Sequence, residues 1–143
     1  MISTPQPLEI NRCPSSVPVP VNKLQRAARF LYKIERIPPA RGISVVFCSD
    51  TAIRKLNVRY RHIDRATDVL SFYMGDDDML GEIYISLLRA AVQARRFHVT
   101  CQEEVIRLFI HGFYHLVGYD HKTERGYREM EKKEKKAFKH FVG

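Results

Sequence analysis

Hydrophobic residues recur along this chain with two periods, which separate predicted strands from predicted helices. Alternation at every second position indicates a strand, because successive side chains point to opposite faces of a sheet. Residues 8–12 and 68–74 alternate in this way, and residues 81–86 return after a predicted hairpin turn at 75–78. Residues 43–48 are an almost unbroken apolar run, which predicts a central strand covered on both faces.

Helical spacing of apolar residues predicts helices over approximately residues 23–35, 51–60, 87–97, 102–116 and 123–141. Asn22, the Ser49-Asp50 pair and Thr100 are predicted N-caps, and Glu103 lies three residues after Thr100, which is the spacing of a capping box. The segment at 102–116 is apolar almost all round. A helix without a polar face is a buried helix, so we expect this one to lie in the core.

Composition is consistent with a single domain over residues 1–143, large enough to bury a core. No apolar run approaches the roughly 20 residues of a membrane span. Residues 1–20 hold five of the seven prolines and predict a lead-in with one short edge strand rather than a signal peptide. Cys13, Cys48 and Cys101 form no C-x-x-C pair, so we expect free thiols in a reducing cytoplasm, with Cys48 in the core.

Charge points toward a polyanionic partner. The 24 Lys and Arg exceed the 16 Asp and Glu, which gives a net charge of +8, and nucleic acid is the first candidate for such a basic chain. Part of this charge lies on the last predicted helix, at Lys132, Lys133, Lys135, Lys136 and Lys139. These lysines either follow a phosphate backbone or form a solvated face paired with neighbouring glutamates.

Three of the six histidines fall within residues 111–121, in the spacing H-x-x-x-H-x-x-G-x-x-H. His111 and His115 would share one face of a helix, and Gly118 suits the helix end, where the chain can turn back and bring His121 toward the other two. Three imidazoles without a fourth protein ligand describe an open, catalytic type of zinc site. The alternative is three unrelated histidines, one capping the helix and two packed in the core.

This spacing is also the ligand spacing of the metzincin proteases, but those enzymes carry a glutamate directly after the first histidine as general base. Here that position is Gly112. The chain therefore has the protease's ligands without its base. Two explanations of Gly112 remain open: it leaves space beside a metal for a bulky phosphate, or it lets another element pack closely against the helix.

Two blocks of sequence coincide with one known pattern. The first block comprises Leu56-Asn57, Tyr60-Arg61, Asp64, residues 67–72 (TDVLSF) and residues 80–85 (LGEIYI). The second block is residues 111–121, followed by Met130-Glu131. Together they resemble the YbeY family, the bacterial rRNA-maturation endoribonucleases. The likeness runs from the first predicted helix to the C-terminus. It departs from the family pattern at Arg65-Ala66, where Lys-Pro is usual, and at Tyr73, where proline is usual.

The resemblance implies an α+β fold, with a mixed sheet of about four strands covered by about five helices and a zincin-like metal helix. It implies a zinc-dependent, single-strand-directed endoribonuclease in 16S rRNA 3′-end maturation and ribosome quality control. The implied partners are the 16S rRNA precursor, the small ribosomal subunit and ribosome-associated proteins. Carried over by position, His111, His115 and His121 bind one zinc ion, and Arg61 is the arginine of the cleft.

Further candidates come from the residues around these positions. Arg61 can fork two phosphate oxygens. The nearby Arg59, His62 and Arg65 predict an electropositive loop, and Arg59, Arg65 and Tyr60 are candidate substrate contacts. Tyr60 and Phe72 either stack unpaired bases or belong to the core. Asp120 either orients a ligand imidazole or caps the turn. His62 and Asp64 are candidate proton carriers.

Two other functions compete with a nuclease. A ribosome-associated RNA-binding factor would use the zinc structurally, although structural sites are usually closed by four ligands, often cysteines, and Cys101 lies ten residues before His111. A metalloprotease is disfavoured by Gly112.

Overall fold

The computed structural model describes residues 6–13, 15, 17–120 and 122–142. Its four strands form one mixed sheet in the order β1-β2-β4-β3, and they are β1 (Leu8–Arg12), β2 (Gly42–Cys48), β3 (Val69–Tyr73) and β4 (Met79–Ser86). β1, β2 and β4 run parallel, and β3 pairs antiparallel with β4 as the predicted hairpin. The α+β class and the mixed sheet are confirmed.

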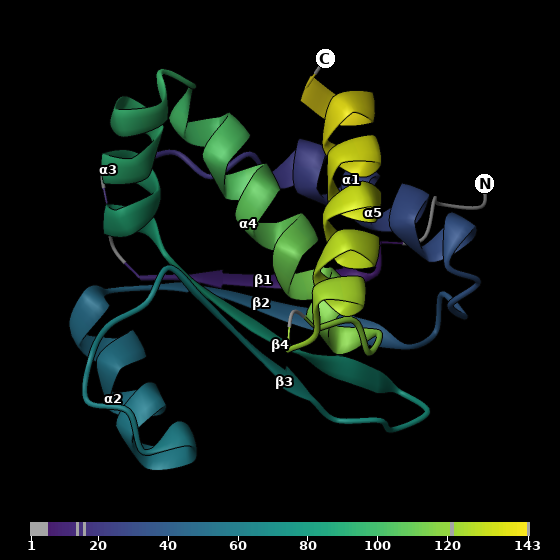
Figure 1. The fold of residues 1–143 in the computed structure, drawn as a ribbon, viewed down its shortest axis with the longest axis horizontal. Coiled ribbons are helices and arrows are strands. Elements are labelled where there is room, and N and C mark those ends of the chain that lie inside the picture. Colours follow the sequence, from purple (N-terminus) through teal and green to yellow (C-terminus); the bar gives the residue numbers. More distant parts are fainter. Residues whose placement is uncertain (1–5, 14, 16, 121, 143) are drawn as a thin grey trace.

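Five helices are present in the described part of the chain: α1 (Val21–Ile34), α2 (Asp50–Arg61), α3 (Leu87–Phe97), α4 (Cys101–Leu116) and α5 (Glu124–Val142). Figure 1 shows α1, α4 and α5 over one face of the sheet, α3 beside α4, and α2 alone against the other face. Because helices cover both faces, the central strand β2 is buried along most of its length, as its apolar run predicts.

The predicted helix caps are correct at two of three positions. Ser49 Oγ accepts from Ala52 N at 3.1 Å, and Thr100 and Glu103 form the full capping box. Asn22 is not a cap, because α1 already begins at Val21 with Pro20 in the capping position. Proline suits the start of a helix, since its fixed φ fits the first turn and it has no N–H to leave unpaired.

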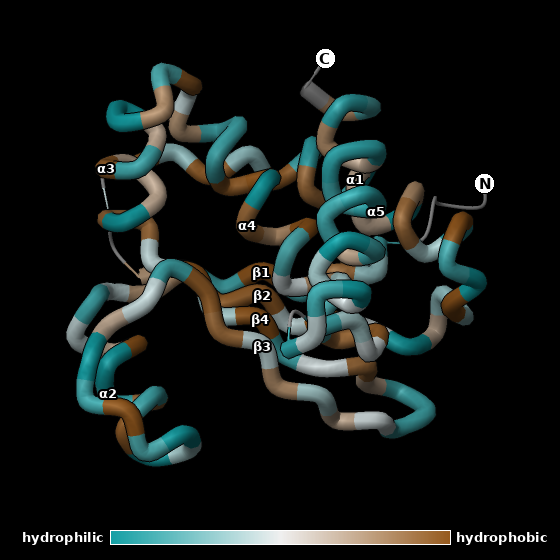
Figure 2. Tube along the Cα trace, viewed as in Figure 1, coloured by the Kyte–Doolittle hydropathy of each residue, from teal (hydrophilic) through white to brown (hydrophobic). Residues whose placement is uncertain are grey.

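The core lies between the sheet and α4, where Phe109, Phe113 and Tyr114 are fully buried. In Figure 2 hydrophobic residues follow the central strands and much of α4, whereas hydrophilic residues cover much of α2 and α5. Cys48 belongs to a smaller apolar cluster under α2, as predicted, and burial raises the pKa of its thiol to about 11. None of the described helices is long and apolar enough to cross a membrane.

Two glycines let α4 approach the sheet more closely than side chains would allow. A Cβ at Gly112 would lie 2.9 Å from Ile83 Cγ2 and 3.0 Å from Ser71 Oγ, and a Cβ at Gly81 would lie 2.6 Å from a Leu116 methyl carbon. Across this contact Ser71 Oγ donates to the Gly112 carbonyl oxygen at 3.0 Å. Of the two explanations for Gly112, the structure supports close packing of the helix on the sheet.

This crowding predicts the sign of a stability change. Alanine normally stabilises an open helix position by about 1 kcal/mol relative to glycine, but we expect Gly112→Ala to destabilise the protein by about 1–3 kcal/mol through overpacking. Denaturant unfolding with a zinc chelator in every sample would measure the difference. In an Ile83→Ala background, which removes the nearest atoms, the penalty should shrink. Stabilisation by Gly112→Ala alone would contradict the close contact.

Candidate active site

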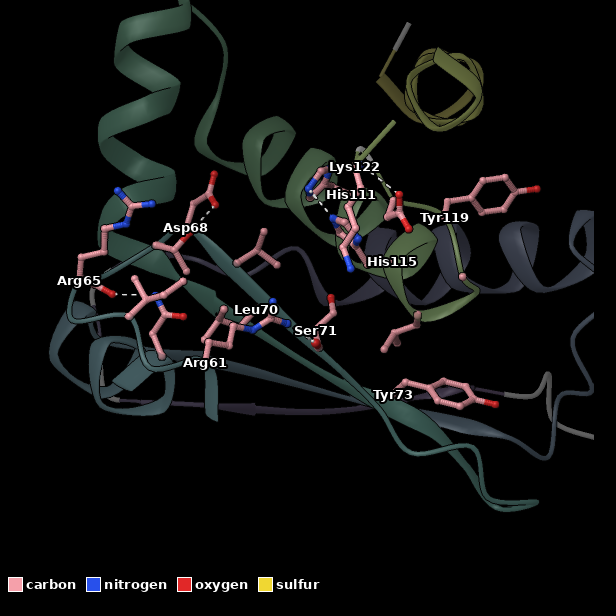
Figure 3. A pocket seen from close by; sticks show the side chains of 17 residues that line it. Arg61, Arg65, Asp68, Leu70, Ser71, Tyr73, His111, His115, Tyr119 and Lys122 are labelled. Carbon is pink, nitrogen blue, oxygen red and sulfur yellow. Dashed lines mark hydrogen bonds between the residues drawn. The ribbon is translucent and has the colours of Figure 1, made fainter. Parts of the chain in front are cut away.

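A cavity of about 730 Å³ lies where the last turns of α4 face β3 and the segment that joins α2 to β3. Its walls contain His111 and His115 from α4, Arg61 from the end of α2, and Arg65 from the joining segment. Figure 3 shows the histidines above the strand and the two arginines on the opposite side of the hollow. Residues more than 40 positions apart in sequence therefore meet in one place.

His111 and His115 lie on one face of α4, as their spacing predicts. Their Nε2 atoms are 3.2 Å apart, and the two rings are nearly perpendicular, at 85°. Two nitrogens that each lie about 2.0–2.1 Å from a tetrahedral zinc ion are themselves separated by roughly 3.3 Å. The observed pair therefore matches two ligands of such an ion. The described residues contain no group of three side chains able to hold a metal, and His121, the third predicted ligand, lies outside them.

Glu134 contacts His111 at Nδ1, the ring nitrogen that does not face His115. Its Oε1 lies 2.7 Å from His111 Nδ1, and both side chains are about three-quarters buried, with 25% of the histidine and 22% of the glutamate exposed. A carboxylate at Nδ1 makes that nitrogen the proton donor and leaves the Nε2 lone pair toward His115 and the cavity. Metal-binding histidines usually have such a partner, which fixes the tautomer and the ring orientation.

Glu134 was not predicted as a site residue, because in the sequence it is one of the glutamates beside the lysines of the last predicted helix. It stands 23 residues after His111, so no helical spacing connects the two. Their contact depends on how α5 packs across α4. The available signal was weak: Glu134 is one of several glutamates on a helix that follows the histidine motif.

Arg61 is fixed at the rim of the cavity. Its Nη2 donates to the Ser71 carbonyl oxygen at 2.9 Å, and its guanidinium carbon lies 5.6 Å from the centre of the Phe72 ring. The same Ser71 donates through its hydroxyl to Gly112, between the histidines. One strand residue therefore contacts both the arginine and the helix that carries the histidines, which sets the arginine's position relative to them.

The joining segment is held by a buried side chain of α2. Asn57 is only 4% exposed, and its Nδ2 donates to the Arg65 carbonyl oxygen at 2.9 Å. This bond holds the backbone at Arg65, whose side chain lines the cavity as the basic loop predicts. Asp68 and Lys122 also line the cavity and were not predicted; Asp68 accepts from Gln93 at 3.1 Å.

Arg59 and Tyr60, two other predicted substrate contacts, do not line this cavity. The Arg59 guanidinium lies over the Tyr60 ring, 5.3 Å from its centre, and Tyr60 packs against the edge of Phe72 at 5.4 Å. Phe72 also packs against Tyr84, as the core alternative predicts. A helix turns successive residues by about 100°, so the three neighbours point in different directions, and only Arg61 of the three lines the cavity.

The minor candidates have structural partners. Asp120 lines the cavity, and its Oδ1 accepts from the Lys122 backbone N–H at 3.0 Å, which is the turn-capping alternative. Asp64 forms an exposed 2.7 Å ion pair with Arg54 outside the cavity. The hydrogen bond from Arg54 lowers the pKa of Asp64, so this carboxylate is a poor carrier of protons near neutral pH.

An α+β fold with a histidine pair on its buried helix and arginines across an open cavity defines an enzyme-like site for an anionic substrate. A family model described as "Endoribonuclease YbeY" matches residues 15–142. The chain therefore belongs to the YbeY endoribonuclease family, in agreement with the resemblance seen in its sequence.

Similar proteins support this membership. A protein named endoribonuclease YbeY from Acholeplasma laidlawii is 43% identical over 96 residues, covering 66% of this chain and 70% of its own length. Another, from Pelotomaculum thermopropionicum, is 38% identical over 123 residues, covering 80% of this chain and 81% of its own length. The solution structure of TM1509 from Thermotoga maritima superposes with a TM-score of 0.63 at 31% identity, over 92% of this chain and 87% of that one.

The role of Glu134 can be tested by metal affinity. We expect Glu134→Ala to weaken zinc binding about 10- to 100-fold, because the His111 ring loses the partner that orients it. Competition with a chromogenic chelator measures the affinity, and Glu129→Ala removes an exposed carboxylate from the same helix as a control. Equal zinc affinity in the two variants would exclude this role for Glu134.

Proposed function

We propose that this protein is a metal-dependent endoribonuclease that cuts single-stranded RNA. The observation that carries the proposal is the single cavity in which the His111–His115 pair and Arg61 face each other. A phosphodiester that enters between them meets a metal-ligand pair on one side and a cation on the other. Membership of the YbeY endoribonuclease family supports the same reaction.

The histidines fit a zinc ion. His111, His115 and His121 would hold it, and the 3.2 Å separation of the first two Nε2 atoms suits tetrahedral coordination. Zinc supplies positive charge that polarises a phosphoryl oxygen and acidifies a water molecule. The protein's own contribution is orientation: Glu134 keeps the proton on His111 Nδ1, and burial of α4 fixes the helix that carries the rings.

Arg61 binds the scissile phosphate. One of its N–H groups is already committed to the Ser71 carbonyl oxygen, which aims the planar guanidinium and reduces the entropy lost on binding. The remaining N–H groups can donate to two phosphate oxygens at once. Because these donors are in place before the substrate arrives, they stabilise the charge that develops during cleavage at little reorganisation cost.

The site argues against the two competing functions. A metalloprotease needs a carboxylate at position 112, but a side chain there would meet Ile83 and Ser71 rather than the cavity. A binding factor with structural zinc predicts ligands enclosed by protein, whereas His111 and His115 line an open cavity of about 730 Å³. The open cavity favours a catalytic site.

In the cell, we propose 16S rRNA 3′-end maturation on the small ribosomal subunit and ribosome quality control in the cytoplasm. The family resemblance supports this assignment, and the net charge of +8 suits an RNA substrate. Accumulation of 16S precursors with extended 3′ ends in cells depleted of the protein is the expected consequence.

Cleavage of a single-stranded RNA that spans a 16S 3′ end tests the proposal. We expect wild type to cut, and His115→Ala and Arg61→Ala to be slower by at least about 100-fold, because the first removes a proposed metal ligand and the second removes the cation proposed to bind the scissile phosphate. Arg54→Ala, which removes an exposed arginine of the same helix outside the cavity, should cut like wild type. Circular dichroism would establish that all four proteins are folded. Equal cutting by all four would mean a contaminating nuclease.

Removal of the metal gives a second test. A zinc chelator should abolish cleavage and lower the melting temperature, since a ligand that binds only the native state stabilises it. Added zinc should restore both. A lower melting temperature with no RNA cleavage under any condition would favour the binding factor, and cleavage that persists after verified metal removal would contradict a metal-dependent reaction.

A further inference from the structure

A second hollow, of about 620 Å³, continues from the active-site cavity on the far side of His115. Both hollows are lined by the same five residues at their junction: Tyr73, His115, Leu116, Gly118 and Tyr119. Gly118 has φ +100°, and a Cβ there would meet nothing within 4 Å, so the shared lining is open at this position. A chain-like substrate bound at His115 can therefore extend into the second hollow.

Apolar side chains line much of this hollow, and two tyrosines stand at its entrance. Leu80, Leu116 and Val117 are among the lining residues, and both leucines are almost fully buried. Tyr73 is 65% exposed, an unusually open position for an aromatic side chain on a strand. Figure 3 shows the rings of Tyr73 and Tyr119 extending in the same direction, past His115, from β3 and from the segment after α4.

The two tyrosines differ in how firmly they are held. The Tyr119 ring packs edge-on against Tyr114 at 5.6 Å and has the Lys133 ammonium 5.2 Å from its centre. The Tyr73 ring lies beside Gly75, where a Cβ would be 2.7 Å from Tyr73 Cε2, but the side chain is otherwise largely open to solvent and can offer surface to a ligand. Tyr73 also stands where the YbeY pattern usually has proline, so stacking by this residue would distinguish this chain within the family.

The charged side chains that line the second hollow suit a bound phosphate group. Arg41 donates through Nε to the Asp76 carbonyl oxygen at 3.0 Å, and its backbone carbonyl oxygen accepts from the Tyr32 hydroxyl at 2.5 Å. Both contacts fix the arginine and leave its terminal N–H groups for a ligand. Glu35 is the one carboxylate among the described lining residues, and Lys133 offsets its charge in a 3.0 Å ion pair.

We propose that this second hollow is a nucleotide subsite of the nuclease. The inference rests on the proposed function: the RNA strand whose scissile phosphate lies between the histidines and Arg61 continues past Gly118, and a neighbouring base stacks on Tyr73 beside Tyr119. Arg41 binds a phosphate of that part of the strand. Every base has a face that can stack, so this subsite selects unpaired RNA without selecting its sequence.

The subsite is tested by equilibrium binding of a 3′-labelled single-stranded RNA. A length of about 12 nucleotides exceeds the roughly 4 nucleotides that the smallest single-strand binding sites hold. Fluorescence anisotropy on zinc-loaded protein would be read at low temperature, and gels would verify that the RNA stays intact. We expect Tyr73→Ala to weaken binding about 5- to 150-fold, the effect of losing one stacked base. Tyr73→Phe keeps the stacking face and should bind within about twofold of wild type. Tyr127→Ala removes an exposed tyrosine of α5 outside both hollows and should bind like wild type.

The salt dependence of RNA binding distinguishes the ionic contribution of Arg41 from the stacking contribution of Tyr73. Arg41→Ala should lower the slope of log Kd against log salt by about 0.7, the value for one phosphate contact on a single strand. Tyr73→Ala should leave that slope unchanged, and Arg36→Ala should match wild type, because Arg36 is an exposed cation that lines neither hollow.

The outcomes distinguish this subsite from the nuclease itself. If wild type binds and cuts RNA while Tyr73→Ala and Arg41→Ala bind with wild-type affinity, the subsite is overturned and the proposed function stands. If wild type neither binds nor cuts single-stranded RNA, the proposed function fails and the subsite fails with it. Weaker binding by both variants, with cleavage in wild type, supports both.

Discussion

The site depends on the close contact between α4 and the sheet at Gly112. With no side chain at that position, the helix settles against Ile83 and Ser71, and Ser71 donates a hydrogen bond to the helix backbone between His111 and His115. The backbone carbonyl oxygen of the same Ser71 accepts from Arg61. A single strand residue therefore sets the positions of the histidines and of the arginine, and a wider helix–sheet spacing would separate them.

A second constraint comes from α5, where two adjacent residues act on the two hollows. Glu134 orients His111 through a 2.7 Å contact, and Lys133 neutralises Glu35 at the wall of the second hollow. The hydrogen bond with Glu35 raises the pKa of Lys133, so this lysine keeps its charge through the neutral range. α5 thus contributes no surface to either hollow, yet it sets the electrostatics of both.

Periodicity predicted the strands and helices well, because alternating and helical patterns record which faces are buried. It also predicted that α4 is buried and that His111 and His115 share a face. The pairing of lysines on α5 was predicted only in outline: Lys135 does pair with Glu131, but Lys133 pairs with Glu35 of another element. Local spacing carries no information about such partners.

The same limit applies to the rest of the site. Arg59, Tyr60 and Arg61 are neighbours in sequence, and only the packing of α2 against β3 decides that Arg61 alone of the three lines the cavity. The Glu134–His111 contact depends on how α5 packs on α4, and the second hollow arises where several elements meet, so no single segment encodes either. Gly112 was recognisable as a departure from the protease pattern, but its packing role needed the position of Ile83.

The proposed mechanism requires that a metal at the histidines and Arg61 act on the same phosphate. Cobalt(II) substituted for zinc gives a visible absorption spectrum that reports directly on ligands at the metal, and a dialkyl phosphate is a minimal substrate analogue. We expect the phosphate to shift this spectrum in wild type, and Arg61→Ala to need a clearly higher phosphate concentration for the same shift. A spectrum insensitive to the phosphate, or one that shifts equally in both proteins, would contradict a shared site.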